Sequence, residues 1–365
     1  MRSKWNFGTQ ASLLVLAAAL VGTPLVASAA PQPAGRAEAP AQRAPFVKAD
    51  AEAVVNALAT KLEDDFVFPD VAKAYAGMLR KNLAAGKYAS FADAGAFAAA
   101  VTADLQAVHK DGHLKLLPPR KEANEVGPAR RGPPPGFKFI SKSGWLAPGV
   151  AYIRFEAFPG KEPILAELRR FIDAHKDAKT LIIDARSHHG GGLAEMDVLF
   201  PQLFDKPTLL VGMDTRLAVD ERSKGEEEPS LRKVAGPAGV VRREHWVTPA
   251  AQPTELRNAK VYLLTSNKTV SAGEHLSLSL KRTHRATLIG ETTRGAGHYG
   301  SVVELGHGYA AFVPVGRTFD PDTGEGWEGV GVKPDIAVPA DKALDEALKL
   351  AGVKSTSEAA LASLK

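Results

Sequence analysis

The sequence contains no cysteine among its 365 residues. This absence excludes disulfide bonds, a thiolate nucleophile, thiolate metal sites and lipid attachment through a cysteine. A strong charge of one sign is also missing, because 46 Lys and Arg residues face 41 Asp and Glu residues, for a formal net charge of +5. The basic residues are dispersed among acidic ones, so nucleic-acid binding is not indicated.

Long hydrophobic runs are absent except for one, from Ala11 to Val26. Arg2 and Lys4 precede it, and small residues follow at positions 27–29. This order predicts a secretory signal peptide over residues 1–29, cleaved after Ala29. An uncleaved anchor is the alternative, but the run is shorter than the ~20 apolar residues that a spanning helix needs. We therefore expect a periplasmic or secreted protein without stable membrane insertion after cleavage.

The rest of the chain divides by composition. Residues 30–46 are rich in Ala and Pro, which predicts an extended tether. From 47 to 116, apolar residues recur every three or four positions, which predicts a small cap domain of three helices. Pro-rich clusters indicate a hinge loop over 117–148. Residues 149–352 then form the largest unit, and 353–365 are a C-terminal tail.

The unit from 149 to 352 alternates short apolar runs with helical patterns. The runs are Gly149 to Phe155, Thr180 to Asp184, Lys260 to Leu264 and Ala286 to Ile289. Buried apolar strands that alternate with helices predict an α/β fold with parallel strands, whose sites form at the carboxyl ends of the strands. The charged segment from Asp214 to Arg243 predicts a solvated loop, with a mobile lid as the alternative.

Ser271 follows one of these runs and begins a helical pattern, in the sequence Ser271-Ala-Gly-Glu274. A hydroxyl at a helix N-terminus meets the positive end of the helix dipole and unpaired backbone N–H groups, which stabilise an alkoxide or an oxyanion. The same Ser-x-x-Glu spacing is the signature of a capping box, in which Ser271 and Glu274 only stabilise the helix end. This motif alone leaves both interpretations open.

Four further motifs favour the catalytic interpretation. They are Asp111-Gly-His113, the DARSHHGGG segment from Asp184, GETTRGAG from Gly290 to Gly297, and WEGVGVKPD from Trp327 to Asp335. With SAGE, and in this order, they resemble the tail-specific (C-terminal processing) protease family, including its tricorn-like members and the modules of interphotoreceptor retinoid-binding protein. The resemblance runs from about Val47 to Val338. It implies an α/β, ClpP/crotonase-like core of mixed, mostly parallel sheet, preceded by a small helical cap domain.

The resemblance implies roles for the residues around Ser271. Ser271 matches the nucleophile, and the N–H of Ala272 matches one oxyanion donor. Gly190 and Gly191 match the glycine loop whose amides complete the oxyanion hole. These roles agree with the chemistry, because attack on an amide carbonyl needs an exposed hydroxyl, a proton acceptor and two N–H donors at one point.

Three residues have supporting roles: Asp184, Arg186 and Glu274. An acid at the end of a buried strand beside Arg predicts a structural ion pair that holds the loop. His188 stands where the family usually has Asn. Because the backbone amides rather than this side chain stabilise the oxyanion, the substitution affects fine positioning more than the chemistry.

The base is not the lysine that many members of the family use, because the matching triplet is Gly295-Ala296-Gly297. Tricorn-like members use a His from the segment that joins cap and core. His113 matches it, and imidazole has the pKa suited to accepting a proton near neutrality. Glu328 resembles the acid that orients this His, and Asp111 is the substitute candidate, although an acid before Gly also caps turns. The histidines at positions 109, 188, 189 and 298 are expected to be packing or surface residues.

No metal site or cofactor is predicted. The histidines lack metal-ligand spacing, and the glycines at 190–192 lack the lysine of a phosphate-binding loop. The stretch from Leu117 to Gly149 is too short to contain the PDZ domain that presents C-terminal tails in many family members. Specificity for such tails therefore stays open.

The leading hypothesis is an exported serine endopeptidase that hydrolyses peptide bonds of unfolded or C-terminal polypeptide segments through an acyl-enzyme, without a cofactor. The alternative is a non-catalytic binding module for an apolar ligand or peptide on the same fold. A third hypothesis is hydrolysis of a small ester or amide, which would use the same acyl-enzyme mechanism. Convergence of Ser271, His113 and Glu328 within hydrogen-bonding reach would favour catalysis over binding. The natural substrate and the oligomeric state are not determined by the sequence.

Overall fold

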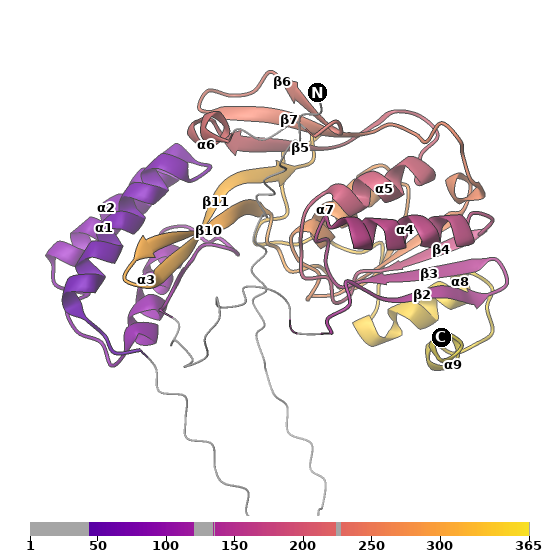
Figure 1. Ribbon diagram of the computed structural model, residues 1–365, viewed down its shortest axis with the longest axis horizontal. Coiled ribbons are helices and arrows are strands. Elements are labelled where there is room, and N and C mark those ends of the chain that lie inside the picture. The colour runs from indigo at the N-terminus through magenta and orange to yellow at the C-terminus, as the bar shows by residue number, and fades with distance from the viewer. Residues whose placement is uncertain (1–43, 120–133, 135, 224–227, 365) are drawn as a thin grey trace, which may run out of the picture.

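The computed structural model describes residues 44–119, 134, 136–223 and 228–364. The predicted signal peptide, most of the predicted tether and the middle of the predicted hinge loop lie outside these residues. Figure 1 shows a group of helices at one end, a sheet covered by helices at the other, and a second sheet between them.

The helical cap consists of α1 (Lys48–Asp65), α2 (Pro69–Ala84) and α3 (Ala94–Val108). Asp93 begins α3 by accepting the Ala96 N–H at 2.7 Å, as an N-cap residue does. The apolar faces of the three helices form one buried cluster, which also includes Tyr309 and Val313 from a strand of the second sheet. The predicted cap of helices is confirmed, and its core is continuous with that sheet.

The sheet at the other end has the order β12-β9-β8-β4-β3-β2. Its strands are β2 (Ile140–Ala147), β3 (Val150–Phe155), β4 (Thr180–Asp184), β8 (Lys260–Thr265), β9 (Thr287–Gly290) and β12 (Ile336–Ala337). All neighbouring pairs are parallel except β2 with β3. This confirms the predicted mixed, mostly parallel α/β core.

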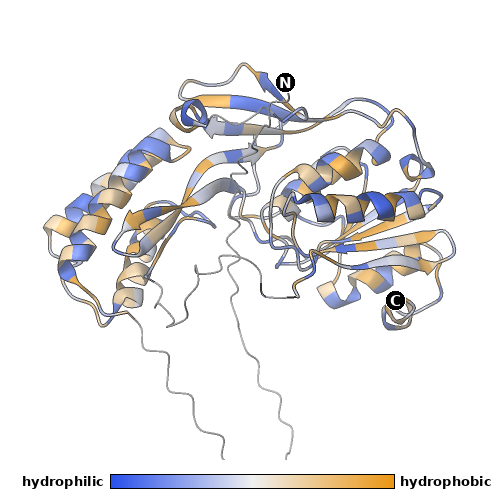
Figure 2. Cartoon of the chain, viewed as in Figure 1, coloured by the Kyte–Doolittle hydropathy of each residue, from blue (hydrophilic) through white to orange (hydrophobic). Residues whose placement is uncertain are grey.

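Helices cover both faces of this parallel sheet (Figure 1). On one face lie α4 (Glu162–Ala174), α5 (Ala194–Leu203) and α7 (Ala272–Arg282), and on the other α8 (Ala343–Leu350) and α9 (Ser357–Ala362). Alternate residues of β4 point to the two faces, so Leu181 and Ile183 join one core cluster and Ile182 the other. Figure 2 shows the resulting apolar colouring along the strands. Short 3-10 turns lie at Glu255–Arg257 and Ala340–Lys342.

The second sheet is antiparallel, with the order β1-β11-β5-β7-β6 and β10 paired to β11. Its strands are β1 (Lys115–Leu117), β5 (Thr208–Arg216), β6 (Leu231–Val234), β7 (Val240–Val247), β10 (His298–Gly306) and β11 (Tyr309–Phe319). The short helix α6 (Leu217–Arg222) follows β5. The prediction of a loop from Asp214 to Arg243 is therefore wrong. Its charges are paired within the sheet: buried Asp214 binds Arg242 at 2.7 Å and Arg317 at 3.0 Å.

Two predicted boundaries also need correction. The last part of the predicted hinge, residues 117–148, is β2, which forms a hairpin with β3. The predicted tail, residues 353–365, contains α9, which begins where the Thr356 hydroxyl accepts the Ala359 N–H at 3.3 Å. Among the helices that the structure describes, none has both the length and the apolar character to cross a membrane.

Candidate active site

The candidate site lies beyond the carboxyl ends of β4, β8 and β9, where sites form in parallel sheets. The segments after these strands carry the glycine loop (190–192), Ser271 and the triplet 295–297. Two other segments reach the same place, Asp111 to Leu114 before β1 and the loop that begins at Trp327.

Ser271 begins α7 in a conformation that residues with a side chain rarely adopt, with φ 56° and ψ −116°. Such strain persists only where the surroundings fix the backbone. Here the Ser271 N–H donates to Glu274 Oε2 at 2.9 Å, and the Val270 N–H donates to the His188 carbonyl at 3.0 Å. The strained turn presents the hydroxyl at the end of the helix.

Ser271 and Glu274 form a capping box, in which the Ser271 side chain faces the N–H of Glu274 and the Glu274 carboxylate accepts the Ser271 N–H at 2.9 Å. The Glu274 N–H also donates to the Ser271 backbone carbonyl at 2.7 Å. The two interpretations that the sequence left open are therefore compatible, because this carbonyl already accepts the N–H of Glu274 and the cap does not depend on the hydroxyl alone.

Glu274 is fully buried and accepts four hydrogen bonds. Besides the Ser271 N–H, its carboxylate accepts the Thr293 hydroxyl at 2.7 Å, the Gly295 N–H at 2.6 Å and the Ala296 N–H at 2.9 Å. Burial raises the pKa of this carboxyl, and the donors oppose the shift. Glu274 thus joins the nucleophile turn to the triplet in which the sequence lacks a lysine.

The glycine loop runs between the continuations of β3 and β8. On the β8 side the His188 carbonyl accepts the Val270 N–H. On the β3 side Phe158 donates its N–H to the Gly190 carbonyl and accepts the Gly192 N–H at its own carbonyl, both at 2.9 Å. The loop therefore extends the parallel pairing of the sheet by one bridge, between Phe158 and the residue after Gly190.

Gly191 is that bridge residue, and its N–H points away from Phe158, because successive hydrogen-bonding groups of an extended chain alternate between its two sides. The opposite side is that of β8, where Ser271 lies. A Cβ at Gly190 would be 3.1 Å from the Ser271 Cβ, and one at Gly191 would be 2.0 Å from the Phe158 carbonyl oxygen, so both positions require glycine. Within the described residues, the N–H groups of Gly191 and Ala272 have no hydrogen-bond acceptor.

The Gly190 N–H, in contrast, donates to His188 Nδ1 at 3.1 Å. Of the three predicted oxyanion donors, Gly191 and Ala272 are therefore unoccupied, whereas Gly190 is paired. His188 itself is fully buried and packs against Phe158, with ring centroids 4.3 Å apart.

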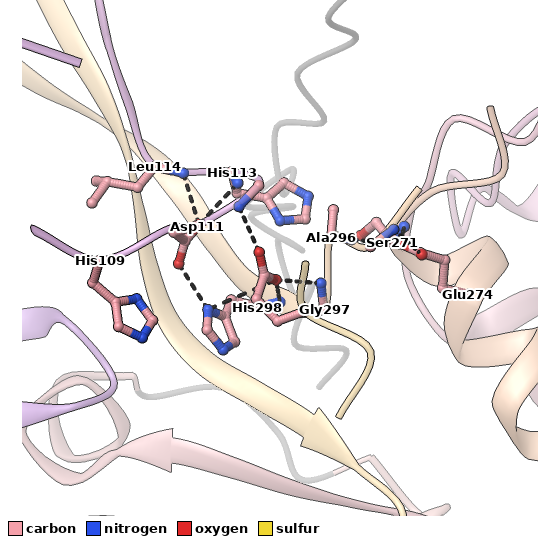
Figure 3. A network of polar contacts seen from close by, with 12 residues as sticks. His109, Asp111, His113, Leu114, Ser271, Glu274, Ala296, Gly297 and His298 are labelled. Carbon is pink, nitrogen blue, oxygen red and sulfur yellow. Dashed lines mark hydrogen bonds and ion pairs between the residues drawn. The ribbon is translucent and has the colours of Figure 1, made fainter. Parts of the chain in front are cut away.

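His113 follows a tight turn in which Asp111 Oδ1 accepts the N–H groups of His113 and Leu114, both at 2.9 Å. The imidazole stacks on Phe312 with centroids 5.0 Å apart, and its Nδ1 is buried without a partner among the residues described. Burial lowers the pKa of His113 to about 4, against the raising effect of Asp111. Among the residues that the structure describes, no hydrogen bond joins His113 to Ser271. Figure 3 shows Ala296 between them.

Glu328 contacts the backbone on both sides of the junction between cap and core. Its Oε1 accepts the Gly112 N–H at 2.5 Å, and its Oε2 accepts the N–H groups of Gly297 at 2.5 Å and His298 at 3.0 Å. The predicted orienting acid is thus bonded to the residue before His113 rather than to the imidazole.

The imidazole that a carboxylate does contact is that of His298, whose Nδ1 lies 2.7 Å from Asp111 Oδ2 (Figure 3). Burial alone would raise the pKa of Asp111, but the His298 hydrogen bond and charge and two backbone N–H donors lower it. The sequence alone predicts a packing or surface role for His298, and its contact with Asp111 corrects that prediction. The only signal in the sequence was its place directly after the Gly295-Ala296-Gly297 triplet.

Asp111, His298 and Glu328 place one potential ligand atom each within 4.8 Å of the others, the arrangement of a possible metal site. However, each carboxylate oxygen already accepts at least one N–H. A cation would have to displace these donors, so the cluster fits a hydrogen-bonded clamp between cap and core better than a metal site.

Asp184 and Arg186 form a bidentate ion pair beside the loop, with N···O distances of 2.9 and 2.6 Å. The Tyr152 hydroxyl donates to the same carboxylate at 2.7 Å, and Arg186 also donates to the Ala340 carbonyl at 2.7 Å. This geometry fits an ion pair that supports the glycine loop without taking part in the reaction.

Comparison with known proteins gives matches along most of the chain. The family model described as Peptidase family S41 matches residues 149–338, and the one described as the N-terminal domain of Peptidase_S41 in eukaryotic IRBP matches residues 35–139. Among curated proteins, the chain is similar to the carboxyl-terminal-processing peptidase 1, chloroplastic, of Arabidopsis thaliana, with 28% identity over 190 residues. The match covers 51% of this chain and 33% of that protein, so the chain spans about a third of this relative's length.

Two solved structures resemble nearly the whole chain. A putative peptidase from Parabacteroides merdae has a TM-score of 0.53 and 17% identity, covering 86% of this chain and 96% of that chain. A lipoprotein from Streptococcus agalactiae has a TM-score of 0.51 and 15% identity, covering 82% and 95%. At these identities the likeness shows the fold, a mixed α/β core preceded by a helical domain.

Proposed function

The chain belongs to peptidase family S41, a family of serine peptidases, and we propose that it hydrolyses peptide bonds of unfolded or C-terminal polypeptide segments through an acyl-enzyme on Ser271. One observation carries the proposal. Ser271 stands at a strained turn beside two N–H groups, those of Gly191 and Ala272, that have no acceptor among the described residues.

In the proposed reaction, Ser271 Oγ attacks the carbonyl carbon of the scissile bond while its proton passes to the imidazole of His113. The carbonyl oxygen becomes an oxyanion, which the N–H groups of Gly191 and Ala272 stabilise. The C–N bond then breaks, and the leaving amine takes the proton from His113. Water, losing a proton to the same imidazole, hydrolyses the acyl-Ser271 ester, and the proton returns to Ser271.

The protonation state of His113 suits this role. With a pKa lowered to about 4 by burial, the imidazole is neutral at pH 7 and is in the form that accepts a proton, but it is a weaker base than an imidazole that titrates near neutrality. Asp111 raises the pKa of the ring without contacting it, and so favours the imidazolium that forms during the reaction. The contact between Ser271 and His113 is proposed to form when substrate binds, because catalytic hydrogen bonds are often long in its absence.

The proposed setting is the periplasm or the cell exterior, with peptides or unfolded proteins as substrates. The signal-peptide pattern over residues 1–29 supports export. Membership of the peptidase family supports a peptide substrate. The name of the Arabidopsis relative, a carboxyl-terminal-processing peptidase, supports C-terminal segments.

A second candidate function is a non-catalytic binding module for an apolar ligand or peptide. The observation that favours it is the His113 imidazole, which bonds neither to Ser271 nor to a carboxylate within the described residues. Under this alternative the site would bind its ligand without forming an acyl-enzyme.

Covalent labelling by a fluorophosphonate separates the two functions. We expect the wild-type protein to be labelled, Ser271→Ala to lose labelling completely, and Ser301→Ala, a variant of an exposed serine on β10, to be labelled like wild type. Mass spectrometry of the labelled peptide would identify Ser271. A folded wild-type protein that is not labelled would contradict the peptidase proposal and favour the binding module.

A further inference from the structure

The side chain of His188 lies beneath the glycine loop, between the loop and the helix of the nucleophile. Its Nδ1 accepts the Gly190 N–H at 3.1 Å. A Cβ at Gly273, in the first turn of α7, would come within 2.9 Å of the same nitrogen, so the imidazole is packed directly on the backbone of that turn. The ring is fully buried, and Phe158 closes its other side.

The hydrogen bond to Gly190 fixes the tautomer of this imidazole. A nitrogen that accepts an N–H carries a lone pair, so the ring proton is on Nε2, which is buried without a partner among the described residues. Burial lowers the pKa of His188 to about 3. The ring therefore remains neutral, and Nδ1 remains an acceptor, across the ordinary pH range.

The backbone of His188 makes a second connection to the nucleophile. Its carbonyl accepts the N–H of Val270, the residue before Ser271. One residue thus bonds the glycine loop through its side chain and the strained turn through its main chain. The distance between the two proposed oxyanion donors depends on both bonds.

We propose that His188 is a positioning residue of the oxyanion hole. By occupying the Gly190 N–H, it makes Gly191 the loop amide that remains for the oxyanion, and it fixes this amide relative to Ser271 and Ala272. The inference rests on the proposed acyl-enzyme reaction and assigns the specific donor in it.

A purely packing role for this buried side chain predicts a different response to substitution. Asn places its Oδ1 at the branch position of the imidazole Nδ1 and can accept the Gly190 N–H, whereas Leu has a methyl group there. Leu, however, is apolar and suits a buried site better than Asn. The hydrogen-bond role predicts that Asn preserves function better than Leu, and the packing role predicts the reverse.

The experiment measures the second-order rate of fluorophosphonate labelling in wild type, His188→Asn and His188→Leu, with His189→Leu as the neighbouring control. We expect His188→Asn to react at close to the wild-type rate. His188→Leu should react about 10- to 100-fold more slowly, because small displacements of a catalytic group have effects of this order. Backbone amide exchange of Gly190 gives a second readout: protection should persist in His188→Asn and be lost in His188→Leu.

Thermal melting establishes which variants are folded. If His188→Leu does not fold, His188→Ala, which removes the acceptor without adding bulk, replaces it with the same expectation. Equal rates in wild type and the variant without an acceptor, or a slower rate in His188→Asn than in His188→Leu, would overturn the role of His188 alone. A folded wild type that does not react at all would overturn the proposed function and this inference with it.

Discussion

Ser271 and His113 are held on two sides of Ala296, and the protein constrains them by different means. Ala296 donates its N–H to Glu274 on the nucleophile side, and its Cβ lies 3.2 Å from where a Cβ of Gly112 would be on the other side. Around Ser271 the backbone is fixed in a strained form at the start of α7. His113 has a fixed backbone too, and its ring stacks on the face of Phe312 with its Nδ1 buried and unpaired among the described residues.

The two buried carboxylates behind these residues show the same contrast. Glu274 accepts only neutral N–H and O–H donors, and burial raises its pKa. Asp111 accepts a hydrogen bond from the imidazole of His298, and its pKa is lowered in spite of burial. We call Ser271 with Glu274 the nucleophile half of the site, and His113 with Asp111 the base half. The nucleophile half is therefore held mainly by backbone hydrogen bonds within the core, whereas the base half depends on an acid–imidazole pair that crosses from cap to core.

The largest effect is expected from Glu274→Ala, which breaks the nucleophile half. It would leave buried backbone donors and the Thr293 hydroxyl without an acceptor. Each unsatisfied buried group costs about 1–3 kcal/mol of stability. With four donors at the low end of this range, we expect a loss of about 4 kcal/mol in the free energy of unfolding, measured with urea, and loss of fluorophosphonate labelling. Glu358→Ala, at an exposed position of α9, is the control. A loss below about 1 kcal/mol would show that the turn does not depend on this carboxylate.

His113→Ala tests the base half. Removal of a general base should lower the labelling rate by about 10²- to 10⁴-fold, with a modest loss of stability, because the ring loses its packing, including the stack on Phe312, but no hydrogen bond at Nδ1 within the described residues. His298→Ala should do the opposite, with a loss of about 3 kcal/mol in stability because Asp111 stays buried without its partner. His307→Ala, on the half-exposed His307, is the control. A folded His298→Ala variant that loses more rate than His113→Ala would assign the base to His298 instead.

The pH dependence of labelling sharpens the same comparison. A base acts in its unprotonated form, so a His113 pKa of about 4 should keep the rate constant from neutrality down to about pH 5, with a fall below it. Because the unfolded chain binds this proton more tightly, with a pKa of about 6.5, stability should also decrease as the pH falls from about 6.5 to 4. Rates and melting curves measured at each pH would test both statements. A rate midpoint near 6.5 would contradict the burial of the ring.

The smallest expected effect is a gain in stability. Ser271→Gly relieves the positive φ of 56° at the nucleophile, a strain of about 1–3 kcal/mol, while glycine adds freedom to the unfolded chain. We expect a net increase of up to about 1 kcal/mol in the free energy of unfolding, together with complete loss of labelling. Ser301→Gly, within a regular strand, should instead lose about 0.5–1 kcal/mol. A destabilised Ser271→Gly would show that the turn is not strained.

The parallel core and the nucleophile turn could be predicted because their signals are local. The strands at Thr180–Asp184 and Lys260–Thr265 are continuous apolar runs, and Ser271 to Glu274 is a compact motif at a helix start. The antiparallel sheet was missed because β5 and β7 carry charges that pair across the sheet, such as Asp214 with Arg242, and charge in a sequence indicates solvation. Partners on other strands are not visible in a single sequence.

The base half could be predicted only in part for the same reason. The motif containing His113 was recognisable, but the partner of Asp111 is 187 positions away and the partners of Glu328 are backbone N–H groups, which every residue offers. The family resemblance predicted that Glu328 contacts the imidazole of His113, whereas in the structure Glu328 accepts the Gly112 N–H. The pairing of His188 with Gly190 was likewise hidden, although the unusual histidine in the loop marked the position.

The hydrogen bond from Gly112 to Glu328 joins residues 216 positions apart, and it has a consequence for timing. During synthesis, the segment that carries His113 emerges well before the residue that docks it onto the core. Until residue 328 has been made, the hydrogen bond that joins this segment to Glu328 cannot form. A nascent chain therefore cannot complete this site before that residue has been added.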